Sequence, residues 1–310
     1  MSLDLACSGA VYARSCDRKP VVIPFSFELY PPRTAAGERA LPQAIDRLAA
    51  VGPDFMSVTY GANGSSRESS LGVLRYILEN TNVQPMAHLT CVGSSYAEAN
   101  QLIRQFLDAG ITSFLALRGD PPQGFGVDEF PLGDLGSAGE LVQLIHRVQA
   151  ERVPYTEVRL PGLPRAAQVN QRREKVRVAV AAFPNGHPRS RLAGPHIDAL
   201  LAKEAAGADL AITQLFFVAD DYLRFVDRAR AAGVRIPIIP GIMPVTSAAR
   251  LLRIAELAEE RVPAALLAAL EGSESESERF AVGVDAAAEL AAAVVLGGRA
   301  GHPLVHIQPT

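Results

Sequence analysis

One stretch of the chain reads Leu115-Ala116-Leu117-Arg118-Gly119-Asp120-Pro121-Pro122, and this stretch decides the fold. An apolar strand ends there in an arginine, a glycine and a carboxylate, and the two prolines stiffen the loop that follows. Three other strand-like segments end in polar groups in the same way, namely Phe25-Ser26-Phe27-Glu28, Ser57-Val58-Thr59 and Ala87-His88-Leu89-Thr90. Polar groups at the ends of several strands predict one shared site.

Segments rich in Val, Ile and Phe recur along the chain, with helical patterns between them. The expected strands are residues 21–27, 55–60, 86–91, 113–117, 177–183, 210–216, 236–242 and 304–307. The expected helices are residues 38–51, 68–79, 96–109, 137–150, 195–206, 220–232, 247–270 and 277–296. This alternation predicts parallel strands joined by right-handed crossovers, and therefore an α/β fold of the (βα)8 TIM barrel type.

The regular alternation of strands and helices predicts a single domain. We expect the barrel to span residues 21–310, with an N-terminal extension at residues 1–20. Residues 151–175 are rich in proline and charge, and they predict an irregular insertion before the fifth strand. The acidic stretch at residues 271–278 predicts a solvated turn whose serines and glutamates begin the last helix.

Charge and composition exclude several classes of protein. The 310 residues are 48% hydrophobic with a formal net charge of -3, and the basic residues are scattered along the chain. This pattern does not predict a nucleic-acid partner. The apolar run at residues 290–296 is far too short to span a membrane, so no membrane partner is expected either. The expected partner is a small molecule.

Cysteines and histidines add little chemistry. Cys7, Cys16 and Cys91 are too few for a disulfide framework and form no CxxC pair, which favours a reducing cytoplasm. No metal site is expected, because His88 and the other histidines are widely separated and no HExxH occurs. The chain also lacks the GxGxxG, GxxxxGK and GxSxG motifs of dinucleotide, phosphate and serine-hydrolase sites.

Glu28 is the strongest candidate for acid–base chemistry. It ends a strand and precedes Tyr30-Pro31-Pro32, so its carboxyl would lie at the mouth of the barrel among aromatic and proline side chains. An apolar pocket raises the pKa of a carboxyl group and makes it a proton donor near neutral pH. The alternative is a strand-end glutamate paired with an arginine.

Asp120 and Gln214 are candidate ligand-binding residues. A carboxylate held by a stiff loop can accept paired hydrogen bonds from a guanidine-like ligand edge, although an ion pair between Arg118 and Asp120 is the alternative. Gln214 lies in an apolar strand, where its amide needs a partner, either a ligand or the backbone. By themselves, Thr59 and His88 are typical of strand and core positions.

Six ordered motifs resemble the methylenetetrahydrofolate reductase family and extend over roughly residues 23–245. They are Ser26-Phe27-Glu28-Leu29-Tyr30-Pro31-Pro32, Phe55-Met56-Ser57-Val58-Thr59-Tyr60-Gly61-Ala62, Ala87-His88-Leu89-Thr90-Cys91, Leu115-Ala116-Leu117-Arg118-Gly119-Asp120-Pro121-Pro122, Ile212-Thr213-Gln214-Leu215-Phe216-Phe217 and Ile238-Ile239-Pro240-Gly241-Ile242-Met243-Pro244.

The resemblance implies an enzyme that reduces 5,10-methylenetetrahydrofolate to 5-methyltetrahydrofolate with NADH or NADPH. It implies that Glu28 is the general acid that opens the five-membered ring of the folate to a 5-iminium cation, which then accepts hydride. It implies that Asp120 binds the pterin and tunes the charge beside it, and that Gln214 and Phe216 bind substrate. These roles are chemically coherent, because they combine a proton donor, an anion beside a developing cation and a neutral orienting amide.

The resemblance also implies FAD contacts, which this chain retains only in part. Positions that match the family's cofactor contacts are Thr59, His88, Arg118, Gly119, Asp120, Phe183, His187 and Lys203. Phe183 stands where the family usually has tyrosine, and an aspartate, an asparagine and a basic residue of the next helix are replaced by His196, Ala199 and Ala202. Because nicotinamide can deliver hydride directly to an iminium carbon, these changes favour a flavin-independent reductase.

Two alternatives remain. The first is an ordinary FAD-dependent reductase that holds the flavin through Arg118, His187, Lys203 and backbone groups. The second is a barrel that binds reduced folate without catalysis, although such a barrel has no need of Glu28 as a proton donor. The sequence does not choose between NADH and NADPH, and it leaves the oligomeric state open, a homo-oligomer included.

Overall fold

The computed structural model describes residues 23–60, 67–119, 133–152, 156–158, 166–168, 175–186, 195–297 and 304–308. The expected N-terminal extension at residues 1–20 lies outside this part of the chain.

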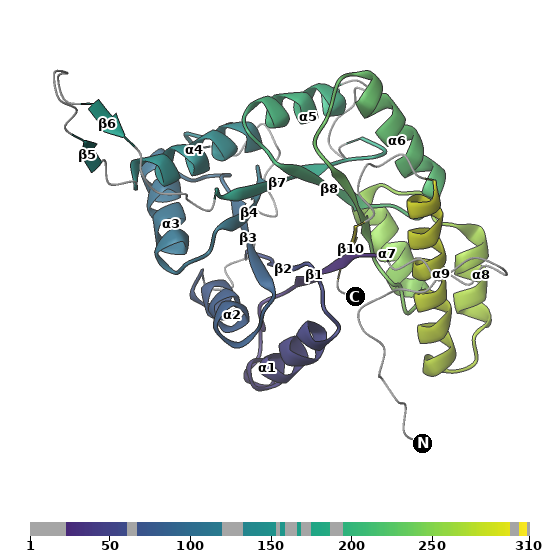
Figure 1. The fold of residues 1–310 in the computed structure, drawn as a ribbon. Coiled ribbons are helices and arrows are strands. Elements are labelled where there is room, and N and C mark those ends of the chain that lie inside the picture. The colour runs from purple at the N-terminus through teal and green to yellow at the C-terminus, as the bar shows by residue number, and fades with distance from the viewer. Residues whose placement is uncertain are drawn as a thin grey trace.

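Parallel strands close into a barrel in the order β1-β10-β9-β8-β7-β4-β3-β2 (Figure 1). The strands of the barrel are β1 Phe25–Leu29, β2 Phe55–Val58, β3 Gln84–Thr90, β4 Ser113–Leu117, β7 Arg177–Ala182, β8 Leu210–Leu215, β9 Ile238–Ile242 and β10 Val305–Ile307. This ring confirms the predicted (βα)8 architecture. The last strand closes the ring by pairing with the first, which places residues from opposite ends of the chain side by side.

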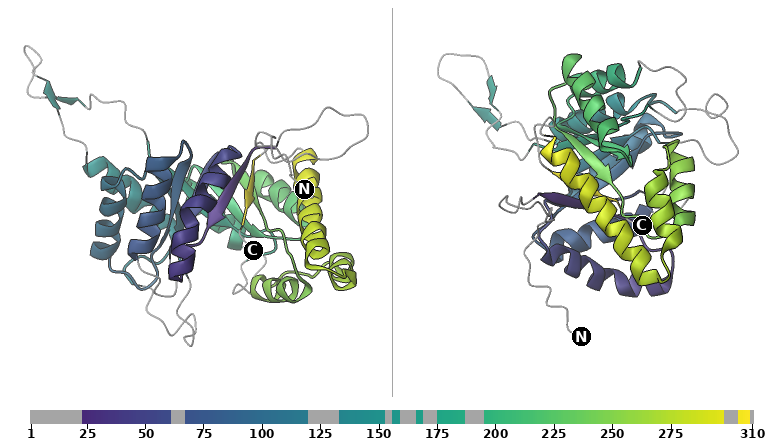
Figure 2. Two further views of the ribbon diagram at one scale, coloured as in Figure 1. Left: turned by 90° about the horizontal axis from the view of Figure 1, so that it is seen from below. Right: turned by 90° about the vertical axis from the view of Figure 1, so that its right-hand side faces the viewer.

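Helices surround the barrel, as the two views of Figure 2 show. They are α1 Ala35–Ala50, α2 Arg67–Asn80, α3 Tyr96–Asp108, α4 Ala138–Glu151, α5 Pro195–Ala205, α6 Ala219–Ala231, α7 Ala248–Ala258, α8 Ala264–Gly272 and α9 Glu276–Leu296. Their starts follow local signals. Ser95 and Glu98 form a capping box at α3, and the Ser275 hydroxyl accepts the backbone N–H of Glu278 at α9. The serine of the acidic stretch therefore begins the last helix, as predicted.

One expected helix was wrong. Residues 247–270 form two helices instead of one, because the chain breaks after α7. Glu259 adopts a left-handed conformation with φ of 54°, and Pro263 stands at the N-cap of α8. A proline inside a continuous helix would lose a backbone hydrogen bond and collide with the preceding turn. Within the barrel and its other helices the differences concern boundaries, such as β1, which begins at Phe25 rather than at residue 21.

The insertion at residues 151–175 contains two short strands that the sequence did not predict. β5 Thr156–Val158 and β6 Ala166–Gln168 pair antiparallel and form a sheet separate from the barrel. Figure 1 shows this pair outside the barrel wall, near α4. Strands of three residues are too short to produce a recognisable hydrophobic period.

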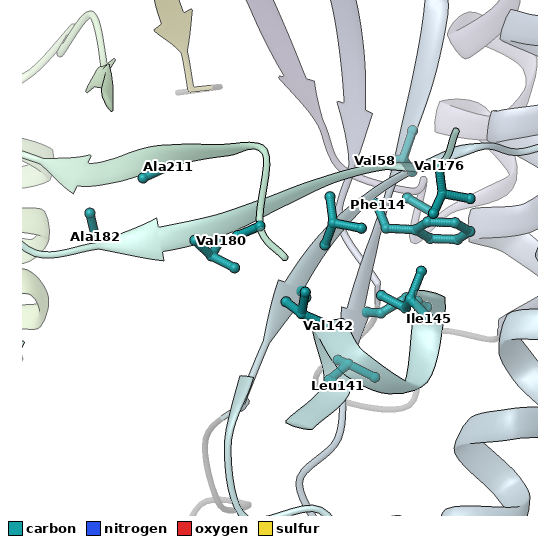
Figure 3. Packing of buried hydrophobic residues seen from close by; sticks show 14 of the residues in the cluster. Val58, Phe114, Leu141, Val142, Ile145, Val176, Val180, Ala182 and Ala211 are labelled. Carbon is teal, nitrogen blue, oxygen red and sulfur yellow. The ribbon is translucent and has the colours of Figure 1, made fainter. Parts of the chain in front are cut away.

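The core has two layers that position the site. Inside the barrel, a compact cluster fills the floor, and its members are Phe55, Met86, Leu115, Ala179, Leu210, Ile212, Ile239 and Leu304. Between barrel and helices lies a larger cluster, in which Leu141, Val142 and Ile145 of α4 lie beside Phe114 (Figure 3). The filled floor leaves the C-terminal ends of the strands as the place for a site. Among the described helices, none is both long enough and apolar enough to cross a bilayer.

Candidate active site

Strand register places polar side chains above the apolar floor of the barrel. Ser26 of β1 lies opposite His306 of β10, and Glu28 of β1 lies opposite Ser57 of β2. Because alternate residues of a strand point to the same face, Ser26 and Glu28 share the interior of the barrel. The site therefore begins where the apolar cluster ends.

Two partners hold Glu28 in place. The Thr59 hydroxyl donates a hydrogen bond of 2.9 Å to Glu28 Oε1, and His306 Nε2 lies 3.8 Å from Glu28 Oε2. The carboxyl side chain is only 12% exposed. Tyr30, which follows the strand, is exposed.

His306 is the centre of a buried polar group that the sequence did not reveal. Its Nδ1 shares a hydrogen bond of 2.8 Å with Ser26 Oγ, its Nε2 shares one of 3.4 Å with Ser57 Oγ, and its ring stacks on Phe55 with centroids 5.6 Å apart. The ring is 1% exposed. One signal was available, since His306 is a titratable residue within the short apolar strand that closes the barrel.

The expectation of a raised Glu28 pKa was wrong. Burial favours the neutral acid, but the interactions with the His306 and His88 rings and with the Thr59 hydroxyl outweigh it and lower the pKa of Glu28 to about 2. Among the described residues, the contacts of the carboxyl group are with threonine and histidine rather than with an arginine. These surroundings thus stabilise the carboxylate.

His88 lies on β3, 5% exposed, and faces the same interior. Burial lowers the pKa of His88 to about 4, against the opposing effect of the Glu28 carboxylate. Its Nε2 is buried and has no hydrogen-bond partner among the described residues. A neutral imidazole with an open nitrogen can bind a polar ligand atom.

Arg118 and Gly119 follow β4, as predicted, and their backbone forms a tight crossing with the loop after β3. The Arg118 carbonyl accepts the N–H groups of Cys91 and Val92 at 3.2 Å and 2.8 Å. Gly119 has φ of +85°, and a Cβ there would approach Val92 Cγ1 to 2.7 Å. This position therefore requires glycine. Cys91 is buried, and burial raises the pKa of its thiol to about 11, so the thiol is inert.

Gln214 and Phe216 lie at the end of β8. The register of β8 against β9 shifts between Ile212 and Leu215, so Gln214 lies in an irregular part of the strand. Its Oε1 accepts the Leu215 N–H at 3.0 Å, which leaves Nε2 as the group to donate to a ligand. The Phe216 ring is buried and stacks on Tyr222, with centroids 5.3 Å apart. Its role in substrate binding stays a prediction.

Asp120 and His187 lie outside the described residues, so their predicted roles rest on the sequence. The structure brings together Glu28, Thr59 and His88, and it places Gln214 on the same barrel.

Among the described residues of α5 and the end of β7, three positions where the resemblance implies polar flavin contacts carry apolar side chains, whereas Asp198 and Lys203 are polar. Phe183 has no hydroxyl group, and Ala199 and Ala202 are exposed methyl groups on α5. Lys203 Nζ donates to the Ala181 carbonyl at 2.8 Å and lies 5.9 Å from the centre of the Phe183 ring. Burial and the nearby Arg118 lower the pKa of Lys203 to about 8. The side chains of Phe183, Ala199 and Ala202 thus offer FAD no hydrogen bond.

His196 lies on the same helix and does not replace the missing partners. Both of its ring nitrogens are buried and have no hydrogen-bond partner among the described residues. Burial, together with Arg228, lowers the pKa of His196, so the ring is neutral near neutral pH. A neutral imidazole offers a flavin no charge.

A closed (βα)8 barrel with a largely buried carboxyl group at the C-terminal ends of its strands is the architecture of a TIM-barrel enzyme. The family model "Methylenetetrahydrofolate reductase" matches residues 17–307. The chain belongs to this family.

Two relatives illustrate the match. The chain is 35% identical over 266 residues to 5,10-methylenetetrahydrofolate reductase of Salmonella typhimurium, which covers 86% of this chain and 79% of the relative. It is 34% identical over 275 residues to methylenetetrahydrofolate reductase (NADH) 1 of Arabidopsis thaliana, which covers 88% of this chain and 44% of that longer protein.

A solved structure matches at the level of the fold. It is an uncharacterized protein from Clostridium thermocellum described as binding two copies of 5-methyl-5,6,7,8-tetrahydrofolic acid. Its TM-score is 0.56 at 13% identity, and the match covers 92% of this chain and 88% of that one.

Proposed function

We propose that this protein reduces 5,10-methylenetetrahydrofolate to 5-methyltetrahydrofolate in the cytoplasm, with hydride delivered directly from NADH or NADPH. The observation that carries the proposal is the buried Glu28 carboxyl, held at the mouth of the barrel by Thr59 and His306. A barrel that only binds folate has no need of a proton donor in that position. The catalytic unit is the single domain of residues 21–310.

Glu28 acts as the general acid. Its protonated form gives a proton to the ring nitrogen of the folate, the bond from that nitrogen to the one-carbon unit breaks, and a 5-iminium cation forms. General acid catalysis of this kind contributes about 10² to 10⁴ in rate. The carboxylate left behind lies near the cation and stabilises it electrostatically.

The remaining residues orient the two substrates. Asp120 accepts hydrogen bonds from the pterin, and the Gln214 amide nitrogen donates to the folate. The open Nε2 of His88 and the Arg118 side chain are the candidates for nicotinamide or folate contacts. The exposed Tyr30 ring covers the ligand and excludes water from the iminium carbon.

Direct hydride transfer is supported by the missing flavin contacts. Phe183, Ala199 and Ala202 offer no hydrogen bond where the resemblance implies polar partners, and Lys203 is bonded to a backbone carbonyl. Each missing hydrogen bond costs about 1 kcal/mol of affinity, so several together weaken flavin binding by orders of magnitude. NADH and NADPH both remain candidate reductants, and the NADH named in the Arabidopsis relative makes it the first to assay.

The test is the absorbance spectrum of the freshly purified protein, followed by an assay of NADH and NADPH oxidation with methylenetetrahydrofolate and no added FAD. A colourless protein that oxidises either nucleotide supports direct transfer. A yellow protein with one flavin per chain would establish the FAD-dependent alternative. A colourless protein that is inactive with and without FAD, yet binds reduced folate, would support the non-catalytic alternative.

A further inference from the structure

Glu28 needs a source of protons. Each turnover of the proposed reaction combines one methylenetetrahydrofolate, one reduced nicotinamide and one proton, and it releases one methyltetrahydrofolate and one oxidised nicotinamide. The hydride carries both electrons to the iminium carbon, and the proton from Glu28 remains on the nitrogen whose bond to that carbon broke. Glu28 is left as a carboxylate, only 12% exposed, beneath the bound substrates.

His306 is placed to supply this proton. Its Nε2 lies 3.8 Å from Glu28 Oε2, so a shift of about 1 Å brings the two atoms to hydrogen-bond distance. Its other nitrogen, Nδ1, shares a hydrogen bond of 2.8 Å with Ser26 Oγ. When Nδ1–H donates its hydrogen bond to Ser26 Oγ, Nε2 is the ring nitrogen that can accept and release a proton. Nε2 is also the nitrogen that faces Glu28.

The surroundings fix the ring in this orientation. The ring stacks on Phe55 at an interplanar angle of 19°, and Ser57 Oγ lies 3.4 Å from Nε2. The two serines and the ring come from three adjacent strands, β10, β1 and β2. Such an arrangement leaves the imidazole little freedom to turn away from Glu28.

We infer that His306 is the positioning partner of Glu28, which orients the carboxyl group toward the substrate and returns to it the proton that each turnover consumes. This inference rests on the proposed function. After the products leave, the site takes up one proton from water, and Glu28 is ionised before the next substrate binds. When the folate covers the site and excludes water, an ion pair becomes more costly and the proton moves to Glu28, where it is needed.

Other titratable groups lie near Glu28 and His306 and are also possible holders of the proton. Among the described residues these are His88 from β3 and Tyr30 at the end of β1. Burial lowers the pKa of His88 to about 4, so His88 is neutral at physiological pH and does not hold the proton. Burial and the Glu28 carboxylate raise the pKa of Tyr30, which also keeps that group neutral. Among the described residues this leaves His306, whose Nε2 lies 3.8 Å from Glu28 Oε2, as the group placed to pass a proton to the carboxyl.

Two variants that replace His306 by an amide separate its role in positioning Glu28 from its role in proton transfer. In His306→Gln the amide reaches toward Glu28 in place of Nε2, and in His306→Asn it reaches toward Ser26 in place of Nδ1, but neither side chain titrates. We expect kcat to fall about 10- to 100-fold in both variants, the usual effect of losing a group that orients and tunes a reactive one. The pH dependence of kcat should also change shape, because a titrating group is gone. His146→Gln is the matched control, because it removes a histidine of α4 that bonds the Gly207 carbonyl outside the site, and it should keep the wild-type pH profile.

NMR signals of the His306 ring in the wild-type protein give a second test, which does not depend on whether the His306 variants fold. In the intact wild-type protein, ¹⁵N signals of the His306 ring are followed against pH and compared with the signals in Glu28→Gln. A shared proton predicts that the pH dependence of these signals changes when Glu28 loses its charge. Unchanged signals, or a His306→Gln enzyme with wild-type kcat and pH profile, would overturn the inference. An inactive wild-type protein would instead reject the proposed function, while the ¹⁵N comparison would still test the pair.

Discussion

The Thr59 hydroxyl donates a hydrogen bond of 2.9 Å to Glu28 Oε1, so the residue that follows β2 holds the proposed general acid on β1. The carboxylate therefore has a neutral donor on one oxygen and the His306 ring near the other. A donor to the ionised form lowers the pKa of a carboxyl group, and Thr59 contributes to the lowered pKa of Glu28.

Thr59→Val removes this donor without changing the volume of the side chain. The pKa of Glu28 should rise, because the carboxylate loses a hydrogen bond, and a group with a raised pKa keeps its proton to higher pH. The fall of kcat on the alkaline side, which reports the Glu28 proton in the enzyme–substrate complex, should therefore move to higher pH, while kcat at its optimum drops by about 10-fold through poorer orientation. Ser70→Ala is the matched control, because the Ser70 hydroxyl donates to the Thr59 carbonyl at 3.0 Å rather than to Glu28. An unshifted profile in Thr59→Val would show that the hydroxyl does not tune Glu28.

Glu28→Gln tests the acid itself. The amide keeps the size of the side chain and can still contact Thr59, but it has no acidic proton to give. We expect turnover to fall by about 10² or more while the Kd for reduced folate stays near that of the wild type. Steady-state kinetics and a binding titration measure the two effects separately. Turnover that is unchanged in this variant would remove Glu28 from the mechanism.

The barrel could be predicted because its strands and helices alternate with clear periods, whereas the environment of Glu28 could not. His306 reaches the site only because β10 closes the barrel beside β1, and the Ser26–His306 hydrogen bond joins residues 280 positions apart. Local sequence around Glu28 shows the aromatic and proline neighbours that suggest a raised pKa, but not the distant histidine that lowers it. Pro263, in contrast, was a visible signal for the break between α7 and α8.

Because His88 is buried and has a lowered pKa, we expect the folded protein to lose stability in mild acid. Its folded pKa of about 4 lies below the ordinary value of 6.5, so the unfolded chain binds more protons between these values. The free energy of unfolding should therefore fall as the pH drops from about 6.5 to 4, by on the order of 2–3 kcal/mol, and this contribution should level off below that window. In His88→Leu the fall in this window should be smaller, as urea unfolding at several pH values would measure.

Glu28 provides the internal comparison for that experiment. Its lowered pKa stabilises the folded state above the ordinary value of 4.5, and this stabilisation is lost as the pH falls toward about 2. The loss below pH 4.5 should thus persist in His88→Leu and diminish in Glu28→Gln. If His88→Leu showed the full wild-type decline between pH 6.5 and 4, the assignment of that window to His88 would be wrong.

Gly283 in α9 marks a close contact that supports the end of the barrel. A Cβ at this position would lie 2.0 Å from the Val245 carbonyl oxygen, which belongs to the loop after β9. Gly283→Ala should therefore destabilise the protein by about 1–3 kcal/mol, the usual cost of overpacking. Gly72→Ala in α2 is the control, because nothing lies within 4 Å of its Cβ, and it should stabilise the helix by about 0.5–1 kcal/mol. Thermal unfolding of both variants measures the contrast, and equal Tm values would contradict the close contact.

Restoring polar side chains near α5 should restore flavin binding. The variant Phe183→Tyr, Ala199→Asn, Ala202→Arg returns a hydroxyl, an amide and a positive charge to positions that now carry none of these groups. Gaining about 1.4 kcal/mol would lower the Kd for FAD tenfold, and we expect at least this change, because each new hydrogen bond contributes about 1 kcal/mol. Quenching of flavin fluorescence on titration with protein measures the Kd without any assay of turnover. Ala202→Glu places the opposite charge at the same exposed position and should not improve binding, since a carboxylate repels the flavin pyrophosphate. A triple variant that binds FAD no better than the wild type would show that the alanines of α5 are not what excludes the flavin.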